Sequence, residues 1–282
     1  MIVFTLNSYL GRTTLAGVVG LAALVGSQAK ADLVYGVSDE LGQLVSFNSA
    51  SPGTLLSAIA LTGTETGEQI RGIDDVSGVI YGLGDANHLY TINPATGVCT
   101  MVGAGAFSPV LNGIDFGFTA GPSQFYVSSD LGQNLSLTTA GVATTMPNYT
   151  GASLDTIAYD PLTSVYYGMS ASSQDLYTVN PATGSTTLVG PTGVDFIARD
   201  GLDITASGAA YFSATVNGQT EFFTANLLTG ALTLVGDVGT PGEVISGLDS
   251  ITVVPTTVPE PGTMALATLG GGLLLFMLRR RK

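Results

Sequence analysis

A repeat with a period of 40 to 48 residues constrains the fold of this chain more than any other feature. An apolar residue followed by aspartate recurs along the middle of the sequence, at spacings of 41, 40, 48 and 46 residues: Asp74, Asp115, Asp155, Asp203 and Asp249. A short strand-like segment follows each of the first four, as at 79–82 and 165–168, and a hairpin comes next in most copies. A unit of about four strands and this length is typical of a β-propeller blade.

The hairpin is the part of the repeat whose copies match best. Residues 89–97 have the sequence LYTINPATG, residues 176–184 have LYTVNPATG, and residues 223–230 form a weaker copy, FTANLLTG. Apolar and polar residues alternate on both sides of the turn, and the glycine can supply a positive φ. Each copy therefore predicts two antiparallel strands.

The ends of the repeat predict how the ring closes. Four complete blades begin near the first four aspartates, but only one further strand, 250–254, follows Asp249. The segment after Ala31 supplies three more strands, at 33–37, 43–48 and 55–61. We therefore predict an all-β, five-bladed propeller of four-stranded blades over residues 32–255. Its N- and C-terminal strands share one blade, which hides a sheet edge. An irregular six-bladed ring and a β-sandwich are the alternatives.

The N-terminus predicts export. Arg12 precedes an apolar run over residues 13–26, which is the length of a signal-peptide core and too short for a comfortable membrane span. Ala29 and Ala31 then satisfy the small-x-small rule, which predicts cleavage between Ala31 and Asp32. Residues 1–31 are therefore expected to be a signal peptide, removed by signal peptidase.

The C-terminus predicts a second processing signal in three parts. The linker 256–263 contains Val258, Pro259, Glu260 and Pro261, and its prolines favour an extended, accessible chain. Residues 264–278 are mostly apolar and would form a transmembrane helix of about 22 Å. The basic residues 279–282 are expected to stay in the cytoplasm by the positive-inside rule.

This ending resembles the sorting signal of the PEP-CTERM family, in which motif, apolar segment and basic tail occur in the same order. The resemblance implies recognition and removal of the tail by an exosortase, a membrane-embedded cysteine protease. It also implies anchoring in the inner membrane before processing and a place at the cell surface or outside the cell afterwards. Such proteins occur in bacteria that make extracellular polysaccharide. A plain tail anchor is the alternative.

The distribution of charge excludes one class of partner. All 21 acidic residues lie between Asp32 and Glu260, where Arg71 and Arg199 are the only basic residues. Such a surface repels the phosphates of nucleic acids. We therefore expect no nucleic-acid binding.

The five repeated aspartates are the strongest candidates for a site. If each occupied the same place in its blade, their carboxylates would form a ring at the central channel. Such a ring could hold Ca²⁺ or provide the acid and base of a glycosidase. The alternative, which we prefer, is that each caps the turn before its blade by accepting backbone N–H bonds. No catalytic residue and no cofactor are therefore predicted, with Ca²⁺ as the open alternative.

Four other residues have side chains that could take part in binding or catalysis. His88 is the only histidine, and its predicted place at a hairpin tip suggests exposure without function. Arg71 and Arg199 are expected to pair with neighbouring carboxylates, or alternatively to bind an acidic sugar. Cys99, the only cysteine, is expected to be a small apolar residue in a strand, with a reactive thiol as the alternative.

Residues 33–254 are also similar to a family of secreted bacterial propellers of unknown function whose hairpins carry LYTINPxTG-like sequences. That similarity implies a fold and secretion but no chemistry. Two functions follow from the residues. The first is a non-enzymatic envelope or matrix module that binds extracellular polysaccharide or a surface protein. The alternative is a secreted hydrolase or lyase acting on polysaccharide.

Overall fold

A computed structural model describes residues 31–38, 40–239, 245 and 247–254. The predicted signal peptide up to residue 30, the Pro-Glu-Pro motif, the transmembrane helix and the basic tail lie outside the described residues. Among the residues described, no helix has the length and apolar character needed to cross a membrane.

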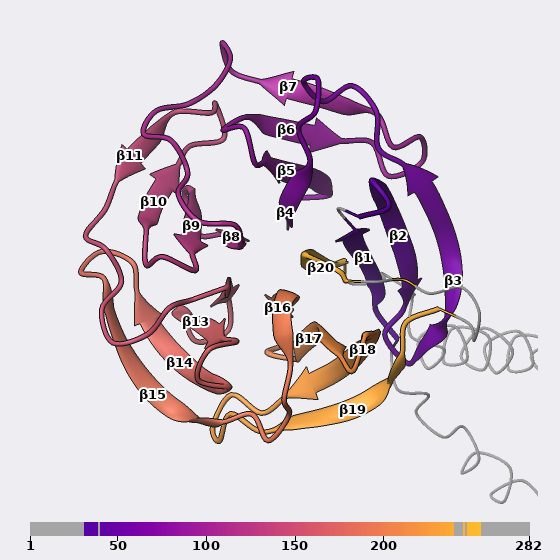
Figure 1. The fold of residues 1–282 in the computed structure, drawn as a ribbon, viewed down its shortest axis with the longest axis vertical. Helices are drawn as coiled ribbons and strands as arrows, with labels where there is room; N and C mark the ends of the chain where they lie inside the picture. The colour runs from indigo at the N-terminus through magenta and orange to yellow at the C-terminus, as the bar shows by residue number, and fades with distance from the viewer. Residues whose placement is uncertain (1–30, 39, 240–244, 246, 255–282) are drawn as a thin grey trace, which may run out of the picture. The chain divides into compact units, whose positions relative to one another are not determined.

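The described chain forms five antiparallel sheets of four strands each, arranged around a central axis (Figure 1). The closing blade consists of β20 (Ser250–Val254), β1 (Leu33–Ser38), β2 (Gln43–Asn48) and β3 (Ser51–Ala60). The second blade consists of β4 (Ile70–Val76), β5 (Val79–Gly84), β6 (Leu89–Ile92) and β7 (Cys99–Val102). The third consists of β8 (Phe116–Ala120), β9 (Phe125–Ser129), β10 (Asn134–Leu137) and β11 (Ala143–Thr145). The fourth consists of β12 (Thr156–Asp160), β13 (Val165–Ser170), β14 (Asp175–Asn180) and β15 (Ser185–Pro191). The fifth consists of β16 (Ile197–Ile204), β17 (Ala210–Val216), β18 (Gln219–Ala225) and β19 (Leu232–Asp237).

The predicted five-bladed propeller is therefore confirmed, including its hairpins. In the β6–β7 turn the Asn93 side chain accepts the Ala95 N–H at 2.9 Å, and Gly97 has φ +72°. The turn between β14 and β15 repeats this arrangement with Asn180 and Gly184. In both copies the asparagine side chain accepts a local N–H bond and the glycine adopts the left-handed conformation that the tight turn requires.

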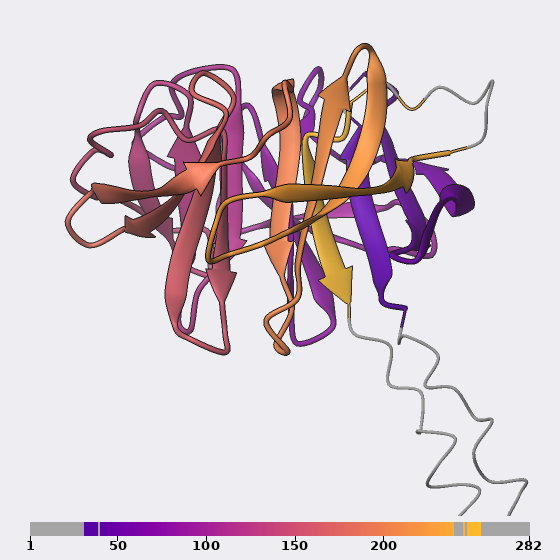
Figure 2. The ribbon, with the colours of Figure 1, turned by 90° about the horizontal axis from the view of Figure 1, so that it is seen from below.

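The closing blade joins the two ends of the described chain, as predicted. Strand β1 pairs with β20 in antiparallel register from Leu33–Val254 to Val37–Ser250. The described chain therefore begins and ends at the same end of this blade, where β1 and β20 lie side by side (Figure 2). This pairing covers the edge that β1 would otherwise expose.

The cores lie between neighbouring blades. Apolar side chains form five buried clusters, most of which contain residues from two adjacent blades. Between the closing and fifth blades, the rings of Phe47 and Phe222 meet edge to face at 5.1 Å. Since each sheet buries both faces in this way, the blades depend on one another for stability.

A second contact joins the inner strands around the channel. At every junction a Ser, Thr or Asp side chain of one blade accepts a backbone N–H of the next blade. The N–H donors and side-chain acceptors are Ile73–Ser250 (3.0 Å), Asp75–Thr252 (3.1 Å), Ala120–Asp74 (2.6 Å), Tyr159–Thr119 (3.0 Å), Leu202–Thr156 (3.1 Å) and Val253–Asp203 (2.5 Å). We call these the inter-blade hydrogen bonds. They all run in the same sense around the ring.

Candidate functional site

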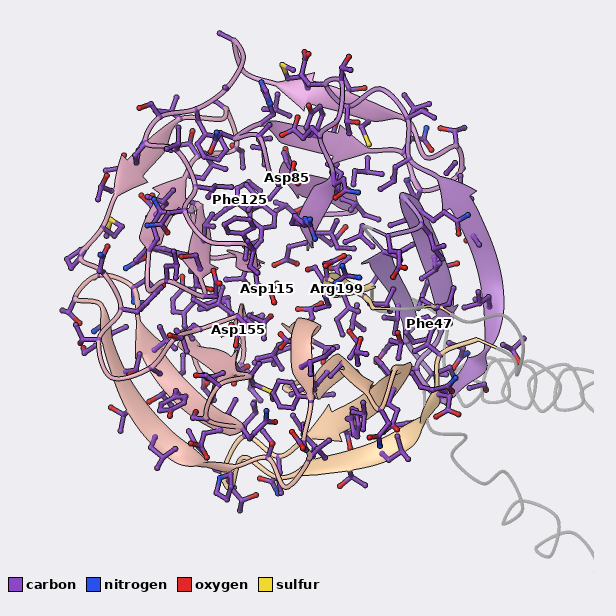
Figure 3. All side chains as sticks on the ribbon, in the orientation of Figure 1. Phe47, Asp85, Asp115, Phe125, Asp155 and Arg199 are labelled. Carbon is purple, nitrogen blue, oxygen red and sulfur yellow. The ribbon has the colours of Figure 1, made fainter. Side chains whose placement is uncertain are left out.

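The repeated aspartates lie at two different heights along the channel. Asp74 and Asp203 lie inside β4 and β16, whereas Asp115, Asp155 and Asp249 immediately precede β8, β12 and β20. The expectation that all five precede their strands at equivalent places is therefore wrong. The cause is that the apolar-Asp pattern occurs at the start of some inner strands and in the interior of others. Figure 3 shows Asp115 and Asp155 near the centre of the ring, with Arg199 beside them.

Asp74 and Asp203 form the deeper group. Each provides one of the inter-blade hydrogen bonds, and the Thr252 hydroxyl donates to Asp74 at 3.3 Å. Burial raises the pKa of Asp74 to about 6, although four hydrogen bonds oppose the shift. Burial and then the charge of Asp74 raise the pKa of Asp203 well above its usual range. These two carboxyl groups hold blades together.

Asp115 and Asp155 belong to the second group, which lies at the start of the inner strands. Asp115 accepts the N–H of Phe116 at 3.2 Å and that of Arg199, on the non-adjacent fifth blade, at 3.0 Å. Asp155 accepts the N–H of Ala171. Burial raises the pKa of Asp155 to about 6, with smaller contributions from Asp115 and Asp130. The repeated aspartates thus accept backbone N–H bonds of two kinds. Some donors are local, such as Phe116 for Asp115, and others are far along the chain, such as Arg199 and Ala171.

Asp200 is close enough to this second group for their charges to interact, and the sequence did not predict this. It is fully buried, and neither carboxylate oxygen has a hydrogen-bond partner among the described residues. Burial raises the pKa of Asp200 well above the usual range, and the charges of Asp115, Asp155 and Asp249 raise it further. A register shift in β16, with Arg199 at φ +81°, precedes Asp200. No periodicity in the sequence predicts such a bulge.

Within the described part of the chain, no three His, Cys, Asp or Glu side chains are grouped so that they could hold a metal ion. Asp115 already accepts two backbone N–H bonds, and Asp155 accepts one from Ala171. Ca²⁺ binding at the repeated aspartates, which we gave as the alternative to a structural role, stays untested.

The two arginines of the propeller pair with carboxylates, as predicted. Arg71 Nη1 lies 3.4 Å from Asp249, and its Nε lies 3.5 Å from Asp85. Arg199 Nη1 lies 3.3 Å from Glu40, where both side chains are partly exposed. The Arg71 pair is the better shielded from solvent, since the side chain of Asp249 is only 1% exposed.

His88 is not the exposed residue that we predicted. Its side chain is 13% exposed, and Nδ1 lies 2.9 Å from the buried carboxylate of Glu68. The hydroxyl of Tyr90 donates to the same Glu68 oxygen at 2.5 Å, and the Ala86 N–H donates to the other oxygen at 3.0 Å. The prediction failed because Glu68 lies in the loop before β4, which folds back over the β5–β6 turn.

Cys99 is buried at the start of β7, which confirms the prediction of a small apolar residue in a strand. Burial raises the pKa of its thiol to about 11. The thiol is therefore protonated at neutral pH, which removes the nucleophilic form.

The fold and the channel define a five-bladed β-propeller whose central carboxyl groups are mostly engaged by backbone. A family model described as a domain of unknown function, DUF4394, matches residues 43–248, and the chain belongs to this family. The PEP-CTERM protein-sorting motif matches residues 257–282. That motif indicates export, anchoring by the C-terminus before processing, and processing by an exosortase.

Solved structures resemble the fold at low sequence identity, and no curated protein matches the chain. A protein of unknown function from Bacteroides thetaiotaomicron has 14% identity and a TM-score of 0.50, over 80% of this chain and 65% of that one. A nidogen/laminin complex chain has 11% identity and a TM-score of 0.49, over 79% and 98%. A virginiamycin B lyase from Staphylococcus aureus has 13% identity and a TM-score of 0.42, over 74% and 70%. These likenesses concern the fold alone.

Proposed function

We propose that the mature protein is a non-enzymatic binding module of the cell envelope or extracellular matrix, delivered by exosortase-type sorting. The observation that carries this proposal is the use of the repeated aspartates. Asp74 and Asp203 each bind a backbone N–H of the next blade, and Asp115 and Asp155 also accept backbone N–H bonds. A buried carboxylate oxygen that accepts a backbone N–H satisfies a donor that would otherwise be costly to bury, so these residues have a role in the scaffold without any chemistry on a substrate.

The charge of the propeller limits which classes of binding partner it favours. The chain between Asp32 and Glu260 carries 21 acidic and 2 basic residues, and both arginines are paired with carboxylates. Long-range repulsion disfavours anionic polymers. Uncharged polysaccharide and neutral or basic surface proteins are therefore the partners that the surface favours.

The test is co-sedimentation of the purified mature protein with two fractions of the envelope, insoluble polysaccharide and outer-surface proteins. We expect saturable binding to one fraction without the release of soluble sugar fragments. An Asp200→Asn variant should bind equally well, since Asp200 is inaccessible.

Two results would overturn the proposal. The first is the absence of saturable binding to either fraction. The second is the release of new reducing or unsaturated sugar ends, which would support the hydrolase or lyase instead.

A further inference from the structure

A cleft between the third and fourth blades has a different character from the acidic channel. Its volume is about 500 Å³, and it lies among strands β9, β13, β14 and β15. The polar residues that line it are Tyr126, Ser164, Tyr166, Thr178, Asn180, Ser185 and Thr187. No side chain with a formal charge at neutral pH contributes to this lining, although the chain has 21 acidic residues.

The outer strands of the two blades beside the cleft differ in length. Strand β11 comprises three residues, Ala143–Thr145, whereas β15 of the neighbouring blade comprises seven. The chain after β11 instead places Tyr149 between the blades, with its ring buried. The Tyr149 hydroxyl has no hydrogen-bond partner among the described residues, and the hydroxyls of Tyr126 and Tyr166 raise its pKa further after burial itself.

Tyrosine rings form one wall of the cleft. The rings of Tyr126 and Tyr166 meet edge to face with centroids 5.1 Å apart, and Tyr159 lies 4.8 Å from Tyr166. All three side chains are partly exposed. The Gln124 side-chain amide donates to the Tyr126 hydroxyl at 2.9 Å, and the Tyr166 hydroxyl lies over Gly121, where a Cβ would collide with it. The rings are therefore held in place before any ligand arrives.

The rest of the lining offers hydrogen-bonding groups that the protein does not use. Within the described residues, the hydroxyls of Ser164 and Thr187 and the amide nitrogen of Asn180 make no hydrogen bond. All three residues are exposed. Neutral donors and aromatic rings in one lining match a ligand with an apolar C–H face and many hydroxyl groups.

We propose that this cleft binds a neutral glycan, with a sugar ring against Tyr126 or Tyr166 and sugar hydroxyls bonded to Asn180 and Thr187. This inference rests on the proposed binding function and names a ligand class and a place for it. An anionic sugar would find no cation in the lining and would be repelled by the acidic surface.

The repeat itself provides a matched control. Thr187 pairs with Thr178 across β14–β15, and Thr100 pairs with Thr91 at the same place in the second-blade hairpin. The Thr178 hydroxyl donates to the Thr187 carbonyl at 3.5 Å, and the Thr91 hydroxyl donates to the Thr100 carbonyl at the same distance. Thr187→Glu introduces charge and bulk into the cleft, whereas Thr100→Glu makes the same change on another blade.

The experiment is a binding assay of the mature protein against neutral, amino and acidic glycans, with thermal melting to verify folding. We expect the unchanged protein to bind neutral glycans. Thr187→Glu should weaken that binding by at least about tenfold, which corresponds to the loss of one hydrogen bond together with blockage of the cleft. Thr100→Glu should bind as the unchanged protein does. Ser185→Glu, a second exposed position in the lining, should repeat the loss if Thr187→Glu fails to fold.

Each other outcome overturns the inference in a distinct way. Binding of neutral glycans that survives both cleft variants would place the site elsewhere. Binding confined to acidic or amino glycans would refute the ligand class. If no glycan binds while envelope proteins still co-sediment, the glycan inference fails and the proposed binding function stands.

Discussion

Replacing Asp155 with asparagine should make the stability of the propeller less dependent on pH. Asp155 is 5% exposed, and its pKa is raised from 3.8 to about 6. The folded protein therefore binds this proton more tightly than the unfolded chain does. Stability is consequently lost as the pH rises from about 4 to about 6 and stays level above that range. A shift of about two units corresponds to about 3 kcal/mol, at roughly 1.4 kcal/mol per unit.

Asparagine removes the titration but keeps an oxygen for the Ala171 N–H. Urea unfolding of the mature protein and of Asp155→Asn should therefore be measured from pH 3.5 to pH 8. Relative to the unchanged protein, the variant should gain about 2–3 kcal/mol of unfolding free energy between the two ends of that range. Asp195→Asn, at an exposed position, is the matched control and should show no such trend. A constant difference between Asp155→Asn and the unchanged protein across the whole range would refute the reasoning.

Three further predictions test other parts of the chain. Alanines in place of Pro259, Glu260 and Pro261 should leave the full-length protein in the membrane fraction; normal release on an immunoblot would contradict exosortase sorting. Asp203→Ala should lower the unfolding free energy by about 1–3 kcal/mol, because the buried Val253 N–H loses its acceptor, and an unchanged urea midpoint would argue against the role of that inter-blade hydrogen bond. Cys99 should react with a maleimide only in denaturant, so rapid labelling of the folded protein would disprove its burial.

The sequence was sufficient for the blades and for their closure. The period of the repeat, the NPATG turns and the single strand after Asp249 each correspond to an observed element. These features are local, because a turn or an alternating strand depends on residues close in the chain.

The contacts between blades could not be predicted in the same way. The height of each aspartate along the channel, the bulge that precedes Asp200 and the loop that brings Glu68 to His88 all depend on residues far apart in the sequence. The cleft lined by Tyr126 and Tyr166 likewise brings together side chains from two blades that are far apart in the sequence.

The closing blade also has a mechanical consequence. Before processing, the sorting tail anchors the propeller through the C-terminal end of β20, so any pull from the membrane acts along that strand. Because β20 lies antiparallel to β1, such a pull loads all the paired residues from Leu33–Val254 to Val37–Ser250 together in shear, rather than peeling them apart singly. Side-chain bonds to β4 and β16 resist the same motion on the inner side of β20. The strand nearest the anchor is thus the one that the ring holds from both neighbours, so a load on the tail meets the best-supported strand of the closing blade.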